Sequence, residues 1–280
     1  MRDRIEKIGG SVIQHGNHND RVYLMKLAAQ DFPGIIPEIE ELAQKRGYGK
    51  IFAKVPGWAQ REFIIRGYTI EALVPLFYNT KDPAVFFGGF PDPSRRFVER
   101  DTRDGIGQII EKAGTLAFSE NRGASDEDQL VRVLDKGRAD QLCGLYRAVF
   151  ESYPFPVFDP DYIRESMENS VVYFGIFDGD RLVAASGADM DMTNLNAEMT
   201  DFAVLPRYRG KKLSPALLKA MEKEMEKHGI TVFYTIARAM QAGINITFAK
   251  AGYLFAGTLI NNTRIAGGIE SMNVWYRIGF

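Results

Sequence analysis

The sequence has few of the features that mark secreted, membrane-bound or nucleic-acid-binding proteins. Its one cysteine, Cys143, cannot form a disulfide within the chain, so a reducing cytoplasm is the expected compartment. No window approaches the roughly 20 apolar residues that span a bilayer, and residues 1–10 lack the apolar core of a signal peptide. The net charge is −1, which argues against a nucleic-acid partner. We therefore expect a soluble, cytoplasmic protein that binds neither membrane nor nucleic acid.

Histidine is also scarce, and its arrangement does not predict a metal site. Two of the 3 histidines, His15 and His18, form an H-x-x-H pattern beside Asp20. Gly16 and Asn17 lie between them and favour a turn over the helix that would bring both imidazoles to one metal, and no third ligand is apparent. We expect no bound metal.

Apolar residues are plentiful, at 45% of a chain whose 280 residues suit two domains. Short apolar strands and amphipathic helices alternate along the chain, which predicts a mixed α/β fold with a central mixed sheet flanked by helices. Asp-Gly at 178–179, between two apolar runs, predicts a β-hairpin. We place a smaller α/β domain and a linker at 1–128, with a short helix inside the linker, and a second α/β domain at 129–280.

The two halves share a short pattern. Each has a strand, then a helix that ends in F-x-x-x-G-Y, then two further strands; the pattern falls at 63–68 and again at 248–253. One interpretation is that the first domain is a degenerate copy of the second, and the other is chance similarity. The sequence leaves both interpretations open.

The strongest chemical signal is a basic loop, Arg207–Lys212, between a predicted strand at 197–205 and a predicted helix at 214–227. Ser214 suits the N-cap because its hydroxyl can accept from a free first-turn amide, and Pro215 suits the first helical position. Unpaired amides and the helix dipole attract anions to such a helix start, and the basic side chains reinforce them. The loop therefore predicts a phosphate or pyrophosphate site, although a solvated basic turn has the same composition.

This strand, loop and helix resemble motif A of the GNAT acetyltransferases, where a V-x-P exit leads to R/Q-x-x-G-x-G/A and backbone amides bind the pyrophosphate of coenzyme A. Arg209 matches that pattern, whereas Lys212 and Ser214 replace its two glycines; lysine supplies charge but not the backbone freedom of glycine. The resemblance implies a C-terminal GNAT fold that uses acetyl-CoA as cosubstrate. The residues that it assigns to cofactor binding are Phe202, Ala203, Val204, Arg209, Gly210, Lys211, Lys212, Leu213, Ser214 and Phe248.

Two carboxylates on the predicted strand are candidates for the general base, since an acceptor ammonium with a pKa near ~10.4 must lose a proton before it can react. Glu198 matches the fourth-strand glutamate of GNAT relatives, and Asp201 is its rival. Their side chains would point to opposite faces of a regular strand, but a bulge, common in GNAT fourth strands, would change this. Phe248 stands where many relatives have a tyrosine that protonates the leaving thiolate. In this protein either another group or water protonates the thiolate, or the thiolate leaves without assistance.

Acidic residues near the loop favour a cationic acceptor, and Asp189, Asp191 and Tyr153 are the candidate substrate contacts. The segments HGNHNDRVYLMKL, YPFPVFDPDYI and NAEMTDFAVLPRYRGKKLS resemble the β-lysine N-acetyltransferase family over nearly the whole chain. That resemblance implies acetylation of the ε-amino group of β-lysine, which gives a neutral compatible solute. A polyamine acceptor, a protein lysine, or acyl-CoA sensing without turnover are the alternatives. The sequence leaves the oligomeric state open, with a homodimer as one option.

Overall fold

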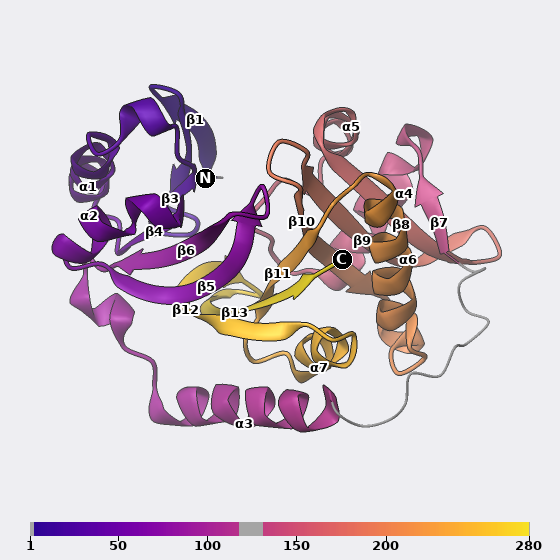
Figure 1. Cartoon of the computed structure of the whole chain (residues 1–280). Coiled ribbons are helices and arrows are strands. Elements are labelled where there is room, and N and C mark those ends of the chain that lie inside the picture. The colour runs from indigo at the N-terminus through magenta and orange to yellow at the C-terminus, as the bar shows by residue number, and fades with distance from the viewer. Residues whose placement is uncertain (1–2, 118–130, 280) are drawn as a thin grey trace.

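A computed structural model describes residues 3–117 and 131–279 of the chain (Figure 1). Part of the predicted linker and the first residues of the second predicted domain lie outside these ranges. The strands are β1 (Arg4–Ile8), β2 (Ser11–Gly16), β3 (Arg21–Lys26), β4 (Lys50–Pro56), β5 (Thr69–Tyr78), β6 (Asp82–Gly89), β7 (Val131–Leu134), β8 (Val171–Asp178), β9 (Arg181–Asp191), β10 (Asn196–Val204), β11 (Val232–Arg238), β12 (Leu254–Ile265) and β13 (Gly268–Ile278). The α-helices are α1 (Ile35–Arg46), α2 (Gln60–Ile65), α3 (Arg100–Ala117), α4 (Ala139–Val149), α5 (Pro160–Asn169), α6 (Leu213–Lys227) and α7 (Ala242–Lys250).

The described strands join one mixed sheet, in the order β1-β2-β3-β4-β6-β5-β12-β13-β11-β10-β9-β8-β7. Each half of the sheet follows the same plan. A parallel pair, β3 with β4 or β10 with β11, is connected through α1 or α6, and a second helix, α2 or α7, leads to a closing hairpin. This mixed sheet with flanking helices confirms the predicted fold class.

The repeated F-x-x-x-G-Y pattern forms the same local structure in both halves. Phe63 and Tyr68 meet edge to face with ring centroids 5.2 Å apart, and Phe248 and Tyr253 do so at 4.9 Å. In each case the tyrosine amide donates to the phenylalanine carbonyl at 3.1 Å, which closes the helix. The shared strand order and this shared packing favour the interpretation of a repeat, while the boundary at 128/129 stays a prediction.

The strand pairing that joins the two half-sheets is registered at a single residue pair, Gly257 on β12 and Ala72 on β5. A Cβ atom at Gly257 would lie 2.1 Å from the carbonyl oxygen of Glu71, and the backbone there has φ of 147°. Only glycine combines this conformation with so close a backbone approach. The junction therefore depends on the absence of a side chain.

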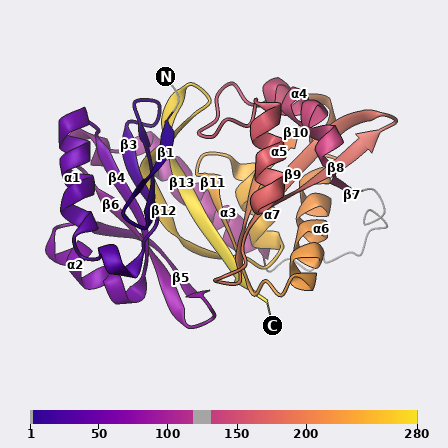
Figure 2. The same ribbon diagram turned by 90° about the horizontal axis from the view of Figure 1, so that it is seen from above.

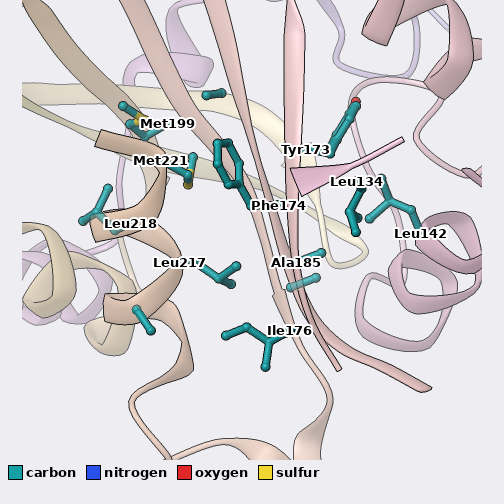
Figure 3. Packing of buried hydrophobic residues seen from close by; sticks show 14 of the residues in the cluster. Leu134, Leu142, Tyr173, Phe174, Ile176, Ala185, Met199, Leu217, Leu218 and Met221 are labelled. Atoms are coloured by element: carbon teal, nitrogen blue, oxygen red, sulfur yellow. The ribbon is translucent and has the colours of Figure 1, made fainter. Parts of the chain in front are cut away.

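Helices cover both faces of the C-terminal half-sheet. Leu217 and Met221 of α6 lie on one side of the strands and Leu142 of α4 on the other (Figure 3). Seen from above, α1 and α2 lie at the left end of the molecule, and α4, α5 and α6 lie at the right end beside the C-terminal strands (Figure 2). Between the halves, a third buried cluster joins strands of both, with the Phe77 ring 4.9 Å from that of Tyr234. The halves thus meet through packed side chains as well as through the sheet.

Two expectations need correction. The helix expected as a short segment after residue 107 is the 18-residue α3, which starts at Arg100 and packs against α7 (Figure 1). The N-terminal residues, where no element was predicted, form β1 and β2. β1 is the edge strand of the sheet and is mostly exposed, so its sequence lacks the hydrophobic periodicity by which a strand is predicted. The expected turn after the first histidine is present at 17–20, but His15 itself is buried on β2 and hydrogen-bonds Tyr48 and Glu6.

Candidate active site

The site forms where β10 and β11 separate. The two strands pair in parallel from Asn196 to Glu198 and no further, so the backbone of β10 beyond Glu198 has no partner on β11 among the described pairs. On the other side, the pairing of β10 with β9 shifts register between Thr200 and Ala203, and Asp201 has a φ of 57°. The predicted bulge is therefore present. A cavity of about 670 Å³ opens at this point.

The α6 end of the cavity is rich in free backbone donors. The helix begins at Leu213 and its N-terminus has no side-chain cap, so the prediction of Ser214 as N-cap is wrong; Ser214 is the second helical residue and lines the cavity. Lys212 occupies the cap position with φ 57° and ψ 26°. This left-handed conformation is the one a glycine would supply, and here lysine adopts it, at a cost of roughly 1–2 kcal/mol. Unsatisfied amides at a helix start bind phosphate.

Most of the residues predicted to bind the cofactor line this cavity, namely Phe202, Val204, Arg209, Gly210, Lys212, Leu213 and Ser214. Three predicted residues do not. Ala203 is buried in the core on the far side of the bulge. Lys211 is exposed and lies over the Tyr208 ring. Phe248 is fully buried between Phe202 and Tyr253.

Several residues of the cavity wall carried no local signal in the sequence. They come from the end of α4, the end of β11 and the start of α7, and include Val149, Phe150, Thr235, Arg238, Gln241 and Thr247. Arg238 is held by two hydrogen bonds to Glu270, at 2.9 and 2.6 Å. Only the pairing of β11 beside β10, which is a long-range feature, brings them to the site.

Glu198 lies where the strands part, in a row of in-register neighbours with Asp189 on β9 and Tyr234 on β11. The Tyr234 hydroxyl donates to Glu198 Oε2 at 3.1 Å. Burial raises the pKa of Glu198 to about 7, while the charge of Lys54 and the tyrosine hydrogen bond act in the opposite direction. A carboxylate that titrates near neutral pH is suited to accept a proton from a substrate ammonium.

Asp201 is brought to the cavity wall by the bulge, together with Tyr153. The Tyr153 hydroxyl donates to Asp201 Oδ1 at 2.5 Å, and the Thr200 hydroxyl donates to the same atom at 3.1 Å. Burial raises the pKa of Asp201 to about 6, and these two hydrogen bonds limit the rise. Asp201 therefore lines the cavity, and its carboxylate accepts hydrogen bonds from Tyr153 and Thr200. Among the described residues, Glu198 accepts one side-chain hydrogen bond, from Tyr234, and it is not among the residues that line the cavity.

The two aspartates predicted to contact substrate occupy different settings. Asp189 is exposed beside Glu198 and accepts from the Ser170 hydroxyl at 2.6 Å. Asp191 accepts from the Thr193 amide and from the amide and side chain of Asn194, so it stabilises the turn between β9 and β10. Both carboxylate oxygens of Asp191 thus accept hydrogen bonds within the turn, and its role as a substrate contact stays a prediction.

The N-terminal half also contributes side chains to the site, and no sequence pattern predicted this. Lys54 on β4 donates from Nζ to the Tyr234 hydroxyl at 3.1 Å and lies over the rings of Phe77 and Tyr234. Tyr23 on β3 is buried close enough to Glu198 that the carboxylate contributes to raising its pKa, after the larger effect of burial. Side chains 180 residues apart in sequence thus share one hydrogen-bonded chain.

Over residues 3–117 and 131–279, no group of three or more histidine, cysteine, aspartate or glutamate side chains is placed to hold a metal ion. In the same ranges, no helix is long and apolar enough to cross a membrane.

Comparison with known proteins gives consistent results. Residues 140–253 match the model of the acetyltransferase (GNAT) family. The chain is 38% identical over 278 residues to the β-lysine N(6)-acetyltransferase of Methanococcus maripaludis, covering 99% of each, and 32% identical to that of Methanosarcina mazei, covering 89% of this chain and 99% of the relative. It is 46% identical to the N-acetyltransferase YodP of Bacillus subtilis, covering 95% of this chain and 94% of the relative.

Proposed function

Because this chain belongs to the β-lysine N-acetyltransferase family of the GNAT superfamily, we propose that it transfers the acetyl group of acetyl-CoA to the ε-amino group of β-lysine. The observation that carries the proposal is Glu198, a carboxylate with a pKa of about 7 at the point where β10 and β11 part. That β-lysine is the acceptor is taken from the names of two relatives that the chain matches over nearly their whole length.

The described residues fit acetyl-CoA. The pyrophosphate would be held by the uncapped amides at the start of α6, with Arg209 and Lys212 adding charge and Gly210 allowing close approach. The pantetheine arm would extend between the separated strands. Backbone groups of β10 beyond Glu198 lack a partner on β11 among the described pairs and are available to the arm and the thioester.

The reaction begins with removal of a proton from the acceptor. The ε-ammonium of β-lysine, with a pKa near ~10.4, binds at the Glu198 carboxylate and transfers one proton to it. The neutral nitrogen attacks the thioester carbonyl carbon, so a C–N bond forms and the resulting tetrahedral species breaks its C–S bond. Glu198 and then solvent take the two protons that the nitrogen loses in all.

The coenzyme leaves as a thiolate. Phe248 is buried and carries no proton to give, so no tyrosine protonates sulfur from that position. A thiol pKa near ~8.5 makes the thiolate a tolerable leaving group, and it then takes a proton from water. Asp201, with its hydrogen bonds from Tyr153 and Thr200, would hold the cavity wall next to the thioester and is the second candidate for the base.

The charge balance of the product supports a role in making a compatible solute. β-Lysine carries two ammonium groups and one carboxylate, and acetylation of one amine leaves a molecule with no net charge. A neutral zwitterion can accumulate without perturbing the ionic balance of the cell. A polyamine or a protein lysine would keep the mechanism and change the acceptor.

The test is release of free coenzyme A by the purified protein in the presence of acetyl-CoA and, in separate reactions, β-lysine, α-lysine, spermidine and a lysine-containing peptide. We expect the highest kcat/KM with β-lysine and a product heavier by one acetyl group. Preference for another amine would overturn the acceptor. Binding of acetyl-CoA without turnover on any amine would overturn catalysis in favour of acyl-CoA sensing.

A further inference from the structure

We propose that Lys54, supplied by the N-terminal half, binds the carboxylate of the acceptor and so restricts the enzyme to amino acids that carry a distal amine. The inference rests on the proposed function and assigns a substrate-binding role to a residue outside the region that matches the GNAT family model.

The position of Lys54 is defined by two hydrogen bonds in series. Its Nζ donates to the Tyr234 hydroxyl at 3.1 Å, and that hydroxyl donates to Glu198 Oε2, also at 3.1 Å. An ammonium has only donors, so the tyrosine oxygen must accept from Lys54 and direct its single proton to Glu198. The cation therefore lies within two hydrogen-bond lengths of the proposed base.

The charge of Lys54 is not neutralised by an ion pair. Among the described residues, the one hydrogen bond found for the Lys54 ammonium is to the Tyr234 hydroxyl, and no carboxylate is found within 4.0 Å of its Nζ. The side chain is half-buried, with Nζ 5.5 Å from the Phe77 ring centroid and 5.4 Å from that of Tyr234. A half-buried ammonium whose one hydrogen-bond partner is a neutral hydroxyl would be stabilised by a hydrogen-bonded anion. Lys54 therefore has the properties of a residue that binds a carboxylate.

The site matches the charges of the proposed acceptor. Glu198 and Asp189 lie side by side across β10 and β9, and both are accessible to solvent. Lys54 faces Glu198 through Tyr234. The site therefore presents two carboxylates and one ammonium, and β-lysine presents two ammonium groups and one carboxylate. With the ε-amine at Glu198 and the carboxylate at Lys54, Asp189 beside Glu198 adds negative charge at the end of the site where the ε-ammonium would bind.

The N-terminal half is fixed against the site, so Lys54 is held in place. The turn between β5 and β6 meets the turn between β9 and β10, where the Asn79 amide donates to the Asn194 carbonyl at 3.1 Å (Figure 1). The Asn196 side chain donates to the Phe77 carbonyl at 3.2 Å. β4 lies between β3 and β6 in the same half-sheet, which places Lys54 on a rigid element.

The experiment compares two acceptors and three proteins. The acceptors are β-lysine and β-lysine amide, which replaces the carboxylate by a carboxamide of nearly the same size. The proteins are the wild type, Lys54→Gln and Lys54→Arg. Initial rates of coenzyme A release give kcat and KM for each pair, and acetyl-CoA affinity with thermal unfolding shows that each variant is folded.

For the wild type we expect KM for the amide to exceed KM for β-lysine by about tenfold or more, the size of a lost hydrogen bond between charged groups. Lys54→Gln should raise KM for β-lysine by a similar factor and change KM for the amide by less than about twofold. Lys54→Arg should keep part of the discrimination, because it keeps the charge and alters the geometry.

Three results would overturn the inference. One is an equal KM of the wild type for β-lysine amide and for β-lysine, a result that does not depend on whether any variant folds. Another is an equal fall in kcat on both acceptors in Lys54→Gln with no change in the ratio of their KM values, which would make Lys54 a positioning residue that acts through Tyr234 on Glu198. The third is an unchanged Lys54→Gln. Failure of the wild type to acetylate β-lysine at all would instead refute the proposed function.

Discussion

Replacement of Glu198 by glutamine tests the proposed base through its pH dependence. The pKa of about 7 means that the carboxylate is half deprotonated at pH 7 and only about one-tenth deprotonated at pH 6. Wild-type kcat/KM should therefore rise roughly tenfold per pH unit below pH 6 and level off near pH 8. The amide of the variant accepts no proton, so the acceptor must lose its proton to water before it binds.

The structure sets the size of the effect. A free amine with a pKa of ~10.4 is deprotonated in roughly one molecule in 2,500 at pH 7, and positioned general bases contribute about 10²–10⁴ in rate. We expect Glu198→Gln to lower kcat/KM at pH 7 by about 10² or more, and its log rate to keep rising by about one per pH unit beyond pH 9. The assay follows free thiol release with saturating acetyl-CoA from pH 5.5 to 9.5.

A matched control distinguishes the effect of removing the proposed base from the effect of removing another carboxylate whose pKa is raised by burial. Glu222 on α6 is also buried, and burial raises its pKa, but it forms an ion pair with Arg277 and lies outside the residues that line the cavity. Glu222→Gln should keep the wild-type pH profile. The assignment is refuted if Glu198→Gln stays within threefold of wild type at pH 7 with the same profile, and Asp201→Asn would then be the variant to examine.

Three further predictions concern stability and cofactor binding. The pKa of Glu198 is raised from 4.5 to about 7 in the folded state, so its contribution to stability is fully present below pH 4.5 and is lost as pH rises through about 7. Glu198→Gln should therefore be more stable than the wild type by about 1–3 kcal/mol at pH 8. Urea unfolding should show a smaller difference between the two proteins at pH 5. Lys212→Gln should weaken acetyl-CoA binding about three- to tenfold in calorimetry, whereas Lys211→Gln, which replaces an exposed residue outside the set that lines the cavity, should stay within twofold; equal effects would contradict the placement of the loop. Gly257→Ala should cost more than about 3 kcal/mol in urea unfolding because its Cβ would overlap the carbonyl oxygen of Glu71, and a cost below 1 kcal/mol would mean that the junction can shift.

The grouping of the residues at the α6 end of the cavity could be predicted because its parts are consecutive in sequence. Strand β10, the basic loop and α6 follow one another, so Arg209, Gly210 and Ser214 needed only local reasoning. The details that local reasoning missed are conformational. The helix starts two residues earlier than its predicted cap residue suggested, and Lys212 takes the left-handed conformation that the missing glycine would have had.

The part of the site around Glu198, Tyr234 and Lys54 was less predictable because it is assembled from distant segments. Glu198 was identified from its position on the strand, but its partners Tyr234 and Lys54 depend on the parallel register of β10 with β11 and on the packing of the two halves. No residue pattern near Lys54 indicates a site. Asp191 shows what composition alone leaves out, since the sequence did not indicate that its carboxylate accepts hydrogen bonds within the turn between β9 and β10.

The most direct test of the central claim is the structure of the product made from β-lysine and ¹³C-labelled acetyl-CoA. Two-dimensional NMR of the purified product identifies the acylated nitrogen through the coupling of the labelled carbonyl to neighbouring protons. The account predicts one acetyl group, on the ε-nitrogen, with the β-amine free. Acetylation of the β-amine, or no product from β-lysine under conditions where another amine is acetylated, would contradict it.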